Sequence, residues 1–188
     1  MSEYSPYYSP DIKMGGTKSE NADPITVLHV DDEEVFLTIT KSYIEKMSDG
    51  RVKIDSFSDP DQVLGQLQEK TYDVIVADYQ MPSMNGLQLL EQVRSQIKEI
   101  PFIILTGRGR EEIAIKALNL GADRYIKKGL DSESMFREVI HAIETVVQHK
   151  QAERLLRESE TKFRSIAESS LVGLAIIQDG QIKYTSAA

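Results

Sequence analysis

Four short apolar runs of this 188-residue chain each lead into side chains that could hold a metal ion or a phosphoryl group. These side chains are three carboxylates, one hydroxyl and one ammonium: Asp31, Asp32, Asp78, Thr106 and Lys128. In an open sheet of alternating strands and helices, sites form just outside the carboxyl ends of the strands. If the four runs are strands of one sheet, we expect all five side chains at one edge.

The carboxylates suit a magnesium site at that edge. Mg²⁺ is a hard cation that takes oxygen ligands and usually keeps several waters. Asp31, Asp32 and Asp78 could supply carboxylate oxygens, and the main-chain carbonyl of Gln80 could complete the protein's share. We therefore predict Mg²⁺ as the cofactor and no organic cofactor site.

Asp78 is the candidate nucleophile for phosphoryl transfer. A carboxylate that attacks a phosphoryl group meets charge repulsion, which a metal ion and a lysine offset. Lys128 suits the lysine's role, and the hydroxyl of Thr106 can donate to a phosphoryl oxygen. Taken singly, such an Asp is more often a turn residue, such a Thr a cap and such a Lys a solvated charge. Their conjunction at one edge favours the functional interpretation.

Strand and helix patterns alternate five times between Pro24 and about residue 148. Apolar runs predict strands over residues 25–30, 52–57, 74–77, 102–105 and 124–126. Helical spacing of apolar residues predicts helices over 33–47, from Pro60, from Asn85-Gly86, over 111–120 and from about Ser132. This pattern predicts an α/β fold: a flavodoxin-like, doubly wound, five-stranded parallel sheet of order 2-1-3-4-5.

The last of these helices is expected to run past the domain. No Pro or Gly occurs between Asp131 and Leu171, and apolar residues continue at Leu155, Leu156 and Phe163. We expect residues 149–169 to be a helical linker, with a paired coil as one form of it. The alternative is a solvated helix that frays after Gln148. Residues 1–24, rich in Ser, Tyr, Pro and Gly, are expected to be a disordered tail.

Bulk composition narrows the classes of partner and compartment. The net charge of −8 argues against a direct electrostatic grip on nucleic acid or on an anionic membrane. The chain has no cysteine, which excludes disulfides, thiolate zinc sites and cysteine nucleophiles. No apolar stretch approaches the roughly 20 residues of a membrane span, so a cytoplasmic protein is expected. His29, inside the first strand, is expected to be a satisfied core or edge residue.

Residues 25 to about 148 resemble the receiver domain of two-component response regulators. The matching motifs are Val30-Asp31-Asp32-Glu33, Asp78-Tyr79-Gln80-Met81-Pro82, Asn85-Gly86, Leu105-Thr106-Gly107, Gly121-Ala122-Asp123 and Tyr125-Ile126-Lys127-Lys128. The resemblance implies that Asp78 is the phosphoacceptor and that Asp31 and Asp32 are metal ligands. It also implies that Thr106 and Tyr125 form a switch pair and that Lys128 holds the phosphoryl group.

The same resemblance implies a signalling domain rather than an enzyme, with chemistry limited to its own phosphorylation and dephosphorylation. Its partner would be a histidine kinase or a phosphotransfer protein. A haloacid-dehalogenase-like phosphatase is a rival that needs a second acid where Gln80 stands. A phosphorylation-independent interaction module is a second rival. Gly129 keeps that rival open, because the family normally has Pro there, often with a cis bond. A non-proline cis bond costs about 3–4 kcal/mol, so a trans or looser loop is expected.

The segment from Glu158 to Ala188 resembles the start of a PAS sensor domain. The similar residues include Lys162-Phe163-Arg164, Val172-Gly173, Asp179-Gly180 and Tyr184. Residues 173–178 and 181–185 predict two strands joined by a tight turn, so residues 170–188 are expected to be an N-terminal fragment of an α+β PAS domain. A hybrid sensor histidine kinase is then a possible parent. A homodimer through the last receiver helix and the linker is a further expectation.

Overall fold

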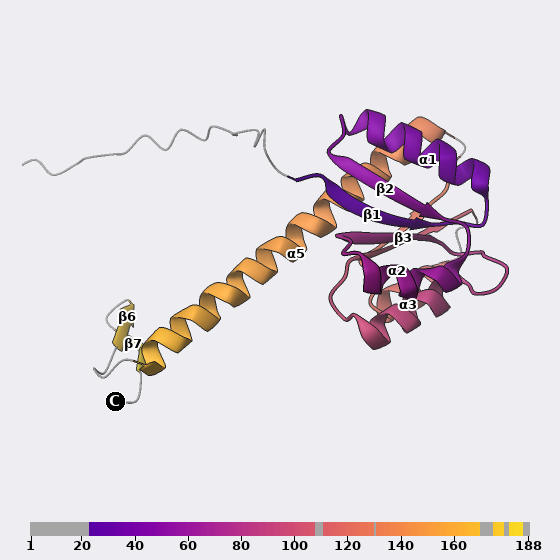
Figure 1. Ribbon diagram of the computed structural model, residues 1–188. Coiled ribbons are helices and arrows are strands. Elements are labelled where there is room, and N and C mark those ends of the chain that lie inside the picture. Colours follow the sequence, from indigo (N-terminus) through magenta and orange to yellow (C-terminus); the bar gives the residue numbers. More distant parts are fainter. Residues whose placement is uncertain (1–22, 108–110, 130, 170–174, 179–180, 186–188) are drawn as a thin grey trace, which may run out of the picture.

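The computed structural model describes residues 23–107, 111–129, 131–169, 175–178 and 181–185. Its main body is one parallel sheet covered by helices on both faces (Figure 1). The strands are β1 (Ile25–Val30), β2 (Val52–Phe57), β3 (Val74–Asp78), β4 (Phe102–Thr106) and β5 (Arg124–Lys127). Their order is β2-β1-β3-β4-β5, which confirms the predicted topology. In this order β1 and β3 are neighbours although an entire strand and three helical segments separate them in the chain.

The helices form two layers that cover opposite faces of the sheet. They are α1 (Glu34–Met47), the short 3₁₀ segment η1 (Pro60–Gln62), α2 (Val63–Glu69), α3 (Gly86–Gln96), α4 (Glu111–Asn119) and α5 (Ser132–Ser169). Apolar side chains of α1 and α5 share one core cluster. Those of α2, α3 and α4 share the other. The predicted helices are therefore all present. Their bounds differ by one residue at the start of α1 and at the end of α4, and the helix predicted from Pro60 is 3₁₀ over η1 and α-helical only from Val63.

The sheet core follows from the alternation of side chains along each strand. On β1, Val27 belongs to the cluster under α1 and α5, whereas Leu28 and Val30 belong to the opposite cluster. Every residue of β3 and β4 is buried. Parallel strands covered on both faces read as continuous apolar runs, which is why these two strands were the clearest in the sequence.

The apolar spacing of α1 predicted the helix but not which side of it is buried. Val35, Ile39 and Tyr43 are 73%, 41% and 50% exposed. The buried residues of the helix are Leu37, Thr40 and Ile44. Because apolar residues occur around much of this helix, their spacing alone could not select the row that packs on the sheet. The exposed row is apolar but lies outside the core.

Two of the predicted helix starts have side-chain caps. The Oδ1 atom of Asp59 accepts from the backbone N–H of Asp61 at the start of η1, 3.0 Å away. Asn85 caps α3 by accepting from the N–H groups of Leu87 and Gln88 at 3.0 Å. The Gln88 side chain accepts in return from the Asn85 N–H at 2.9 Å. This reciprocal pair fixes the start of α3 beside the end of β3.

The long helix α5 begins inside the domain and runs out of it (Figure 1). Beyond it the strands β6 (Ala175–Gln178) and β7 (Gln181–Thr185) pair in antiparallel fashion, as predicted. The expected turn at Asp179-Gly180 and the expected tail over residues 1–24 lie almost entirely outside the described residues. Among the helices that the structure describes, none is long and apolar enough to cross a lipid bilayer.

Candidate phosphoacceptor site

The strand order brings the predicted acidic residues to one place. Val30 of β1 pairs in register with Ala77 of β3, so the next residues, Asp31 and Asp78, leave adjacent strands at the same edge. On the other side of β3, Asp78 pairs with Leu105, which places Thr106 immediately beyond it. Sequence reasoning predicted this convergence from the order of the strands, and the register confirms it.

Lys128 joins the two carboxylates. Its ammonium Nζ lies 2.6 Å from Asp31 Oδ2 and 2.6 Å from Asp78 Oδ1. Asp31 and Asp78 are both buried, and the lysine side chain is largely covered. Charged groups removed from water need a partner of opposite sign. The site is thus a triad of two carboxylates and one ammonium, with one negative charge in excess.

The pKa values follow from this shared cation. Burial raises the pKa of Asp31 and of Asp78, and the hydrogen bonds and charge of Lys128 oppose that rise without cancelling it. Burial alone would lower the pKa of Lys128, but its hydrogen bonds to both carboxylates raise it. A single ammonium cannot fully neutralise two buried carboxylates, so the site favours additional positive charge.

Backbone groups hold the two carboxylates in position. The N–H of Glu33 donates to Asp31 Oδ1 at 3.0 Å, and the N–H of Gln80 donates to Asp78 Oδ2 at 2.5 Å. The loop that carries Lys128 is tied to β4, because the Lys128 N–H donates to the Thr106 carbonyl at 2.7 Å. These bonds orient the side chains before any ligand arrives.

Gly86 has a role that its sequence context only hinted at. A Cβ atom on this residue would lie 2.5 Å from the main-chain oxygen of Asp78, a distance that carbon atoms essentially never show. The Gly86 N–H donates to the Tyr79 carbonyl at 3.0 Å. The start of α3 therefore approaches the Asp78 backbone so closely that only glycine fits. The sequence marked Gly86 as a helix start and gave no sign of this contact.

Two further side chains near the triad were missed or misjudged. The Lys128 ammonium lies over the ring of Phe36, 4.2 Å from its centre, and nothing in the sequence pointed to this contact. His29 is fully buried as expected, but neither ring nitrogen has a hydrogen-bond partner among the described residues. The expectation of a satisfied histidine was therefore wrong. Burial, with the nearby Lys128 charge, lowers its pKa to about 3.

The remaining predicted site residues take different positions. Thr106 is buried at the end of β4. Tyr125 is partly exposed, but its hydroxyl is buried and has no hydrogen-bond partner in the described part of the chain. Asp32 and Gln80 are exposed. The structure thus joins Asp31 and Asp78 through Lys128 and leaves Asp32 facing solvent beside them.

A magnesium ion fits the chemistry of this donor set. The buried carboxylates of Asp31 and Asp78 are hard oxygen donors that already face a shared positive charge. No three Asp, Glu or His side chains among the described residues are grouped as ready-made ligands. Since the ammonium lies between the two carboxylates, a metal ion there would require Lys128 to move aside.

The departure at Gly129 leaves Lys128 in reach of the site. The described residues contain no cis peptide bond, so the loop is trans, as expected without proline. A Cβ on Gly129 would meet only ordinary contacts near 3.8 Å. The position of Lys128 is set by its bonds to Thr106, Asp31 and Asp78, and not by a proline.

Comparison with known proteins identifies the same region. Residues 27–140 match the family model described as the response regulator receiver domain. The two-component response regulator PhoP of Pseudomonas aeruginosa is 35% identical over 82 residues, which are 44% of this chain and 36% of that protein. The response regulator SaeR of Staphylococcus aureus is 34% identical over 102 residues, which are 54% of this chain and 43% of that protein. The chain thus spans less than half the length of these curated relatives.

Solved structures show the same fold. The Francisella response regulator 1452 receiver domain has a TM-score of 0.59 at 27% identity, covering 66% of this chain and 98% of that one. A CheY-like receiver domain protein from Methanospirillum hungatei has a TM-score of 0.61 at 24% identity, covering 70% and 99%. The second likeness bears on the fold alone. In both comparisons the match covers almost the whole chain of the solved structure.

Proposed function

Because the chain belongs to the response regulator receiver domain family, we propose that it is a phosphoacceptor module of a two-component phosphorelay. A partner histidine kinase or phosphotransfer protein would transfer a phosphoryl group to Asp78 with Mg²⁺ present. The phosphorylated state would then act through α5 on the segment that follows. A cytoplasmic location belongs to the same proposal.

The observation that supports Asp78 most strongly is its shared contact with Lys128. Its carboxylate is buried, is held by the Gln80 N–H, and faces an ammonium at 2.6 Å. A carboxylate in this position can attack an incoming phosphorus atom, while the lysine is close enough to follow the negative charge onto the phosphoryl oxygens. Burial strengthens this electrostatic help, because little water competes.

Asp31, Asp32, Asp78 and the Gln80 carbonyl would hold the magnesium ion. When bound, the ion offsets the repulsion between the Asp78 carboxylate and the phosphoryl group. Asp31 is pre-oriented for this by the Glu33 N–H. The exposed Asp32 provides the solvent side of the site. Displaced from between the carboxylates, Lys128 would be released to bind the phosphoryl group.

Thr106 and Tyr125 are proposed as the switch. Thr106 is the last residue of β4. It follows Leu105, which pairs with Asp78, and it pairs with Lys127 of β5. The Tyr125 hydroxyl, buried without a partner in the described residues, is a polar group that gains from any rearrangement supplying a hydrogen bond. A shift of Thr106 toward the phosphoryl oxygens would alter the space next to β5 and change the surface formed by α4, β5 and α5.

Two alternatives make different predictions. An interaction module that needs no phosphorylation has no use for two buried carboxylates that share one ammonium, which is the feature against it. A hybrid sensor kinase with a PAS domain after α5 contains the same receiver chemistry. It differs only in the output, for which the β6–β7 hairpin is the sole described element.

The decisive experiment is phosphorylation of the purified chain by a small phosphodonor with Mg²⁺, followed by intact-mass measurement and peptide mapping. We expect one phosphoryl adduct on the peptide that contains Asp78, and its loss in Asp78→Asn and after chelation of the metal. Asp49→Asn, an exposed carboxylate in the turn between α1 and β2 at the opposite edge of the sheet, is the matched control and should be modified normally. An adduct mapping to another native residue in Asp78→Asn would overturn the assignment.

A further inference from the structure

We propose that an ion pair between α5 and the receiver is a reversible latch that sets the direction in which α5 leaves the domain. The latch joins Arg157 of α5 to Glu99, which lies in the loop between α3 and β4. When the latch is closed, α5 is held beside the receiver. When it opens, α5 is free to swing about its packed end. The loop that carries Glu99 leads into the amino end of β4, so the latch lies at the edge of the sheet opposite Asp78.

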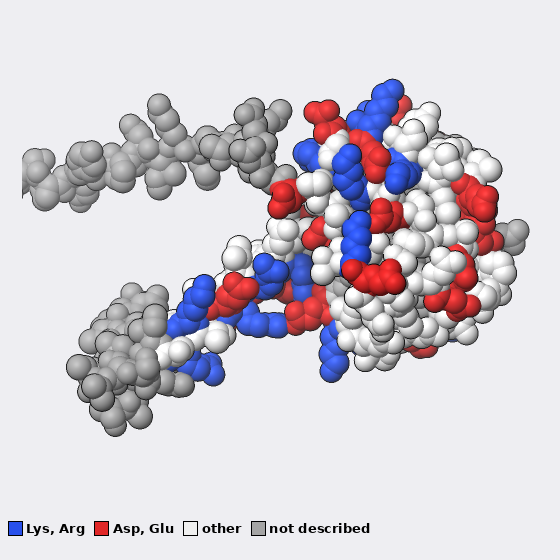
Figure 2. Space-filling model, viewed as in Figure 1, with Lys and Arg blue, Asp and Glu red and all other residues white. Residues whose placement is uncertain are grey.

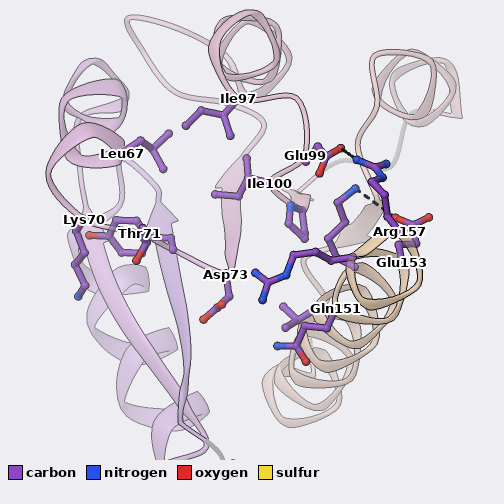
Figure 3. Close-up of a pocket in the computed structure, with 15 residues that line it drawn as sticks. Leu67, Lys70, Thr71, Asp73, Ile97, Glu99, Ile100, Gln151, Glu153 and Arg157 are labelled. Atoms are coloured by element: carbon purple, nitrogen blue, oxygen red, sulfur yellow. Dashed lines mark hydrogen bonds and ion pairs between the residues drawn. The ribbon is translucent and has the colours of Figure 1, made fainter. Parts of the chain in front are cut away.

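Between its packed end and the latch, α5 spans a cavity instead of packing on the core. Val147 is buried in the core. Over about the next 15 Å of the helix, three basic side chains line a cavity of about 330 Å³: Lys150, Arg154 and Arg157. Leu67 and Ile97, both partly exposed, lie across the cavity from α5 (Figure 3). Protein interiors are normally close-packed, so this hollow leaves α5 room to move relative to the receiver.

The latch crosses this cavity. Arg157 Nη1 lies 2.6 Å from Glu99 Oε1, although the two residues are 58 positions apart in sequence. Figure 3 shows the two side chains reaching toward each other. The hydrogen bond and charge of Arg157, and then the charge of Lys150, hold the pKa of Glu99 below its usual range. The Glu99 carboxylate therefore faces two cations of α5, which favours the closed position.

The receiver's end of the latch is fixed in place. Arg94 of α3 donates from Nη1 to the Ile100 carbonyl and from Nη2 to the Gly121 carbonyl, each at 2.7 Å. The side chains of Ile100 and Pro101 are buried. These contacts hold the loop that carries Glu99 on the body of the domain. When the latch opens, α5 is therefore the part that moves.

The exposure of the latch makes it reversible. The side chains of Arg157 and Glu99 are 67% and 56% exposed, and such a pair gains little in water and is screened by salt. Basic and acidic side chains alternate along this part of α5 (Figure 2). Most of them pair within the helix, as Arg154 does with Glu158 at 3.3 Å. Of the ion pairs that the structure describes beyond residue 148, Arg157–Glu99 is the one that reaches the receiver.

The test uses the absence of cysteine from the chain, which allows two spin labels to be attached at chosen positions. Gln68→Cys in the last turn of α2 and Ser159→Cys on α5, both at exposed positions, carry the labels. Ser159 lies about 18 Å along the helix from Val147, so a swing of about 15° moves its label by about 5 Å. Double electron–electron resonance on the full chain should give one narrow distance distribution at low salt. Salt at about 1 M should broaden it and shift its mean by about 5 Å.

Charge variants separate the latch from a general effect of salt. Glu99→Lys should give the broad distribution at low salt, because the new cation would repel Arg157 and Lys150. Adding Arg157→Glu to that variant restores opposite charges and should restore the narrow distribution. Glu91→Lys makes the same charge change at an exposed position of α3 and is the matched control, which should behave as the wild type does.

Three results would overturn the latch. They are a broad distribution in the wild type at low salt, a narrow one in Glu99→Lys, and a charge swap that does not restore the narrow distribution. The measurement does not involve phosphorylation of Asp78. Its outcome is therefore separate from the test of the phosphoacceptor site.

Discussion

The Lys128 ammonium lies 4.2 Å from the centre of the Phe36 ring, so the cation of the acidic triad also contacts α1. The Phe36 ring is 6.4 Å from that of Phe136 on α5, centre to centre. Tyr43, two turns after Phe36 on α1, stacks on Phe136 with the ring centres 5.3 Å apart. A continuous set of ring contacts thus leads from the acidic site to the helix that leaves the domain. Any movement of Lys128 changes the first contact of that set.

Phe36→Leu should weaken the response of α5 to phosphorylation while leaving Asp78 able to accept the group. The ring's attraction for an ammonium is about 0.5–2 kcal/mol, and leucine removes it. Hydrogen exchange along α5, with and without phosphodonor, measures the response. Tyr43→Leu is the control, because it also removes a ring next to Phe136 but one that has no contact with Lys128. Equal loss of response in both variants would rule out a route through Lys128.

Lys128→Met should destabilise the metal-free protein and make it depend on magnesium. Removing the ammonium leaves the buried carboxylates of Asp31 and Asp78 without a counter-charge, at a cost of up to about 3–5 kcal/mol. Because Mg²⁺ would supply that charge, it should raise the melting temperature more in the variant than in the wild type. Lys127→Met, at the exposed neighbouring position, is the control. If Mg²⁺ does not change the melting temperature of Lys128→Met, the metal does not bind between these carboxylates.

Gly86→Ala should reduce both stability and phosphorylation. The added methyl group would meet the Asp78 carbonyl oxygen at 2.5 Å, so α3 or the Asp78 backbone must shift. Such overpacking costs about 1–3 kcal/mol. Gly65→Ala is the matched control within α2, where a Cβ meets nothing within 4 Å. It should stabilise the protein by about 0.5–1 kcal/mol. Urea unfolding and adduct yield measure the two effects, and a Gly86→Ala protein equal to wild type in both would contradict this account.

His29→Leu should stabilise the protein at pH 7 and flatten its response to mild acid. The buried imidazole lacks hydrogen-bond partners in the described chain, which costs about 1–3 kcal/mol. Its pKa is about 3 in the folded state, against 6.5 in the unfolded chain. Below pH 6.5 the unfolded state therefore binds a proton that the folded state does not, and stability falls as the pH falls toward 3.

The size of that acid effect is about 1.36 kcal/mol per pH unit below 6.5, or about 2 kcal/mol between pH 6.5 and pH 5. Chemical unfolding of wild type and His29→Leu at pH 7 and pH 5 gives the difference. Asp31 and Asp78, whose pKa values are raised, titrate in both proteins, so their contribution largely cancels in this comparison. An unchanged difference between the two proteins at the two pH values would show that His29 is not buried as described.

The strands and the acidic residues were predictable from local sequence, and the strand order followed from the regular alternation of strands and helices. Apolar runs such as residues 74–77 mark buried strands, and short polar motifs directly follow them. The Phe36–Lys128 contact was not predictable. The two residues are 92 positions apart, and no sequence pattern indicates that this ring and this lysine meet. Likewise the lack of partners for His29 and the close approach at Gly86 depend on how whole elements pack. Which side of α1 is buried depends on the same packing.

The absence of Gly and Pro from Asp131 to Leu171 makes α5 a single stiff rod anchored at one end. Its first turns are packed on the sheet, whereas residues 149–169 extend about 30 Å beyond them at 1.5 Å per residue. A reorientation of about 5° at the packed end would move the far end by roughly 3 Å. A displacement too small to disturb the core is thereby enlarged at the β6–β7 hairpin.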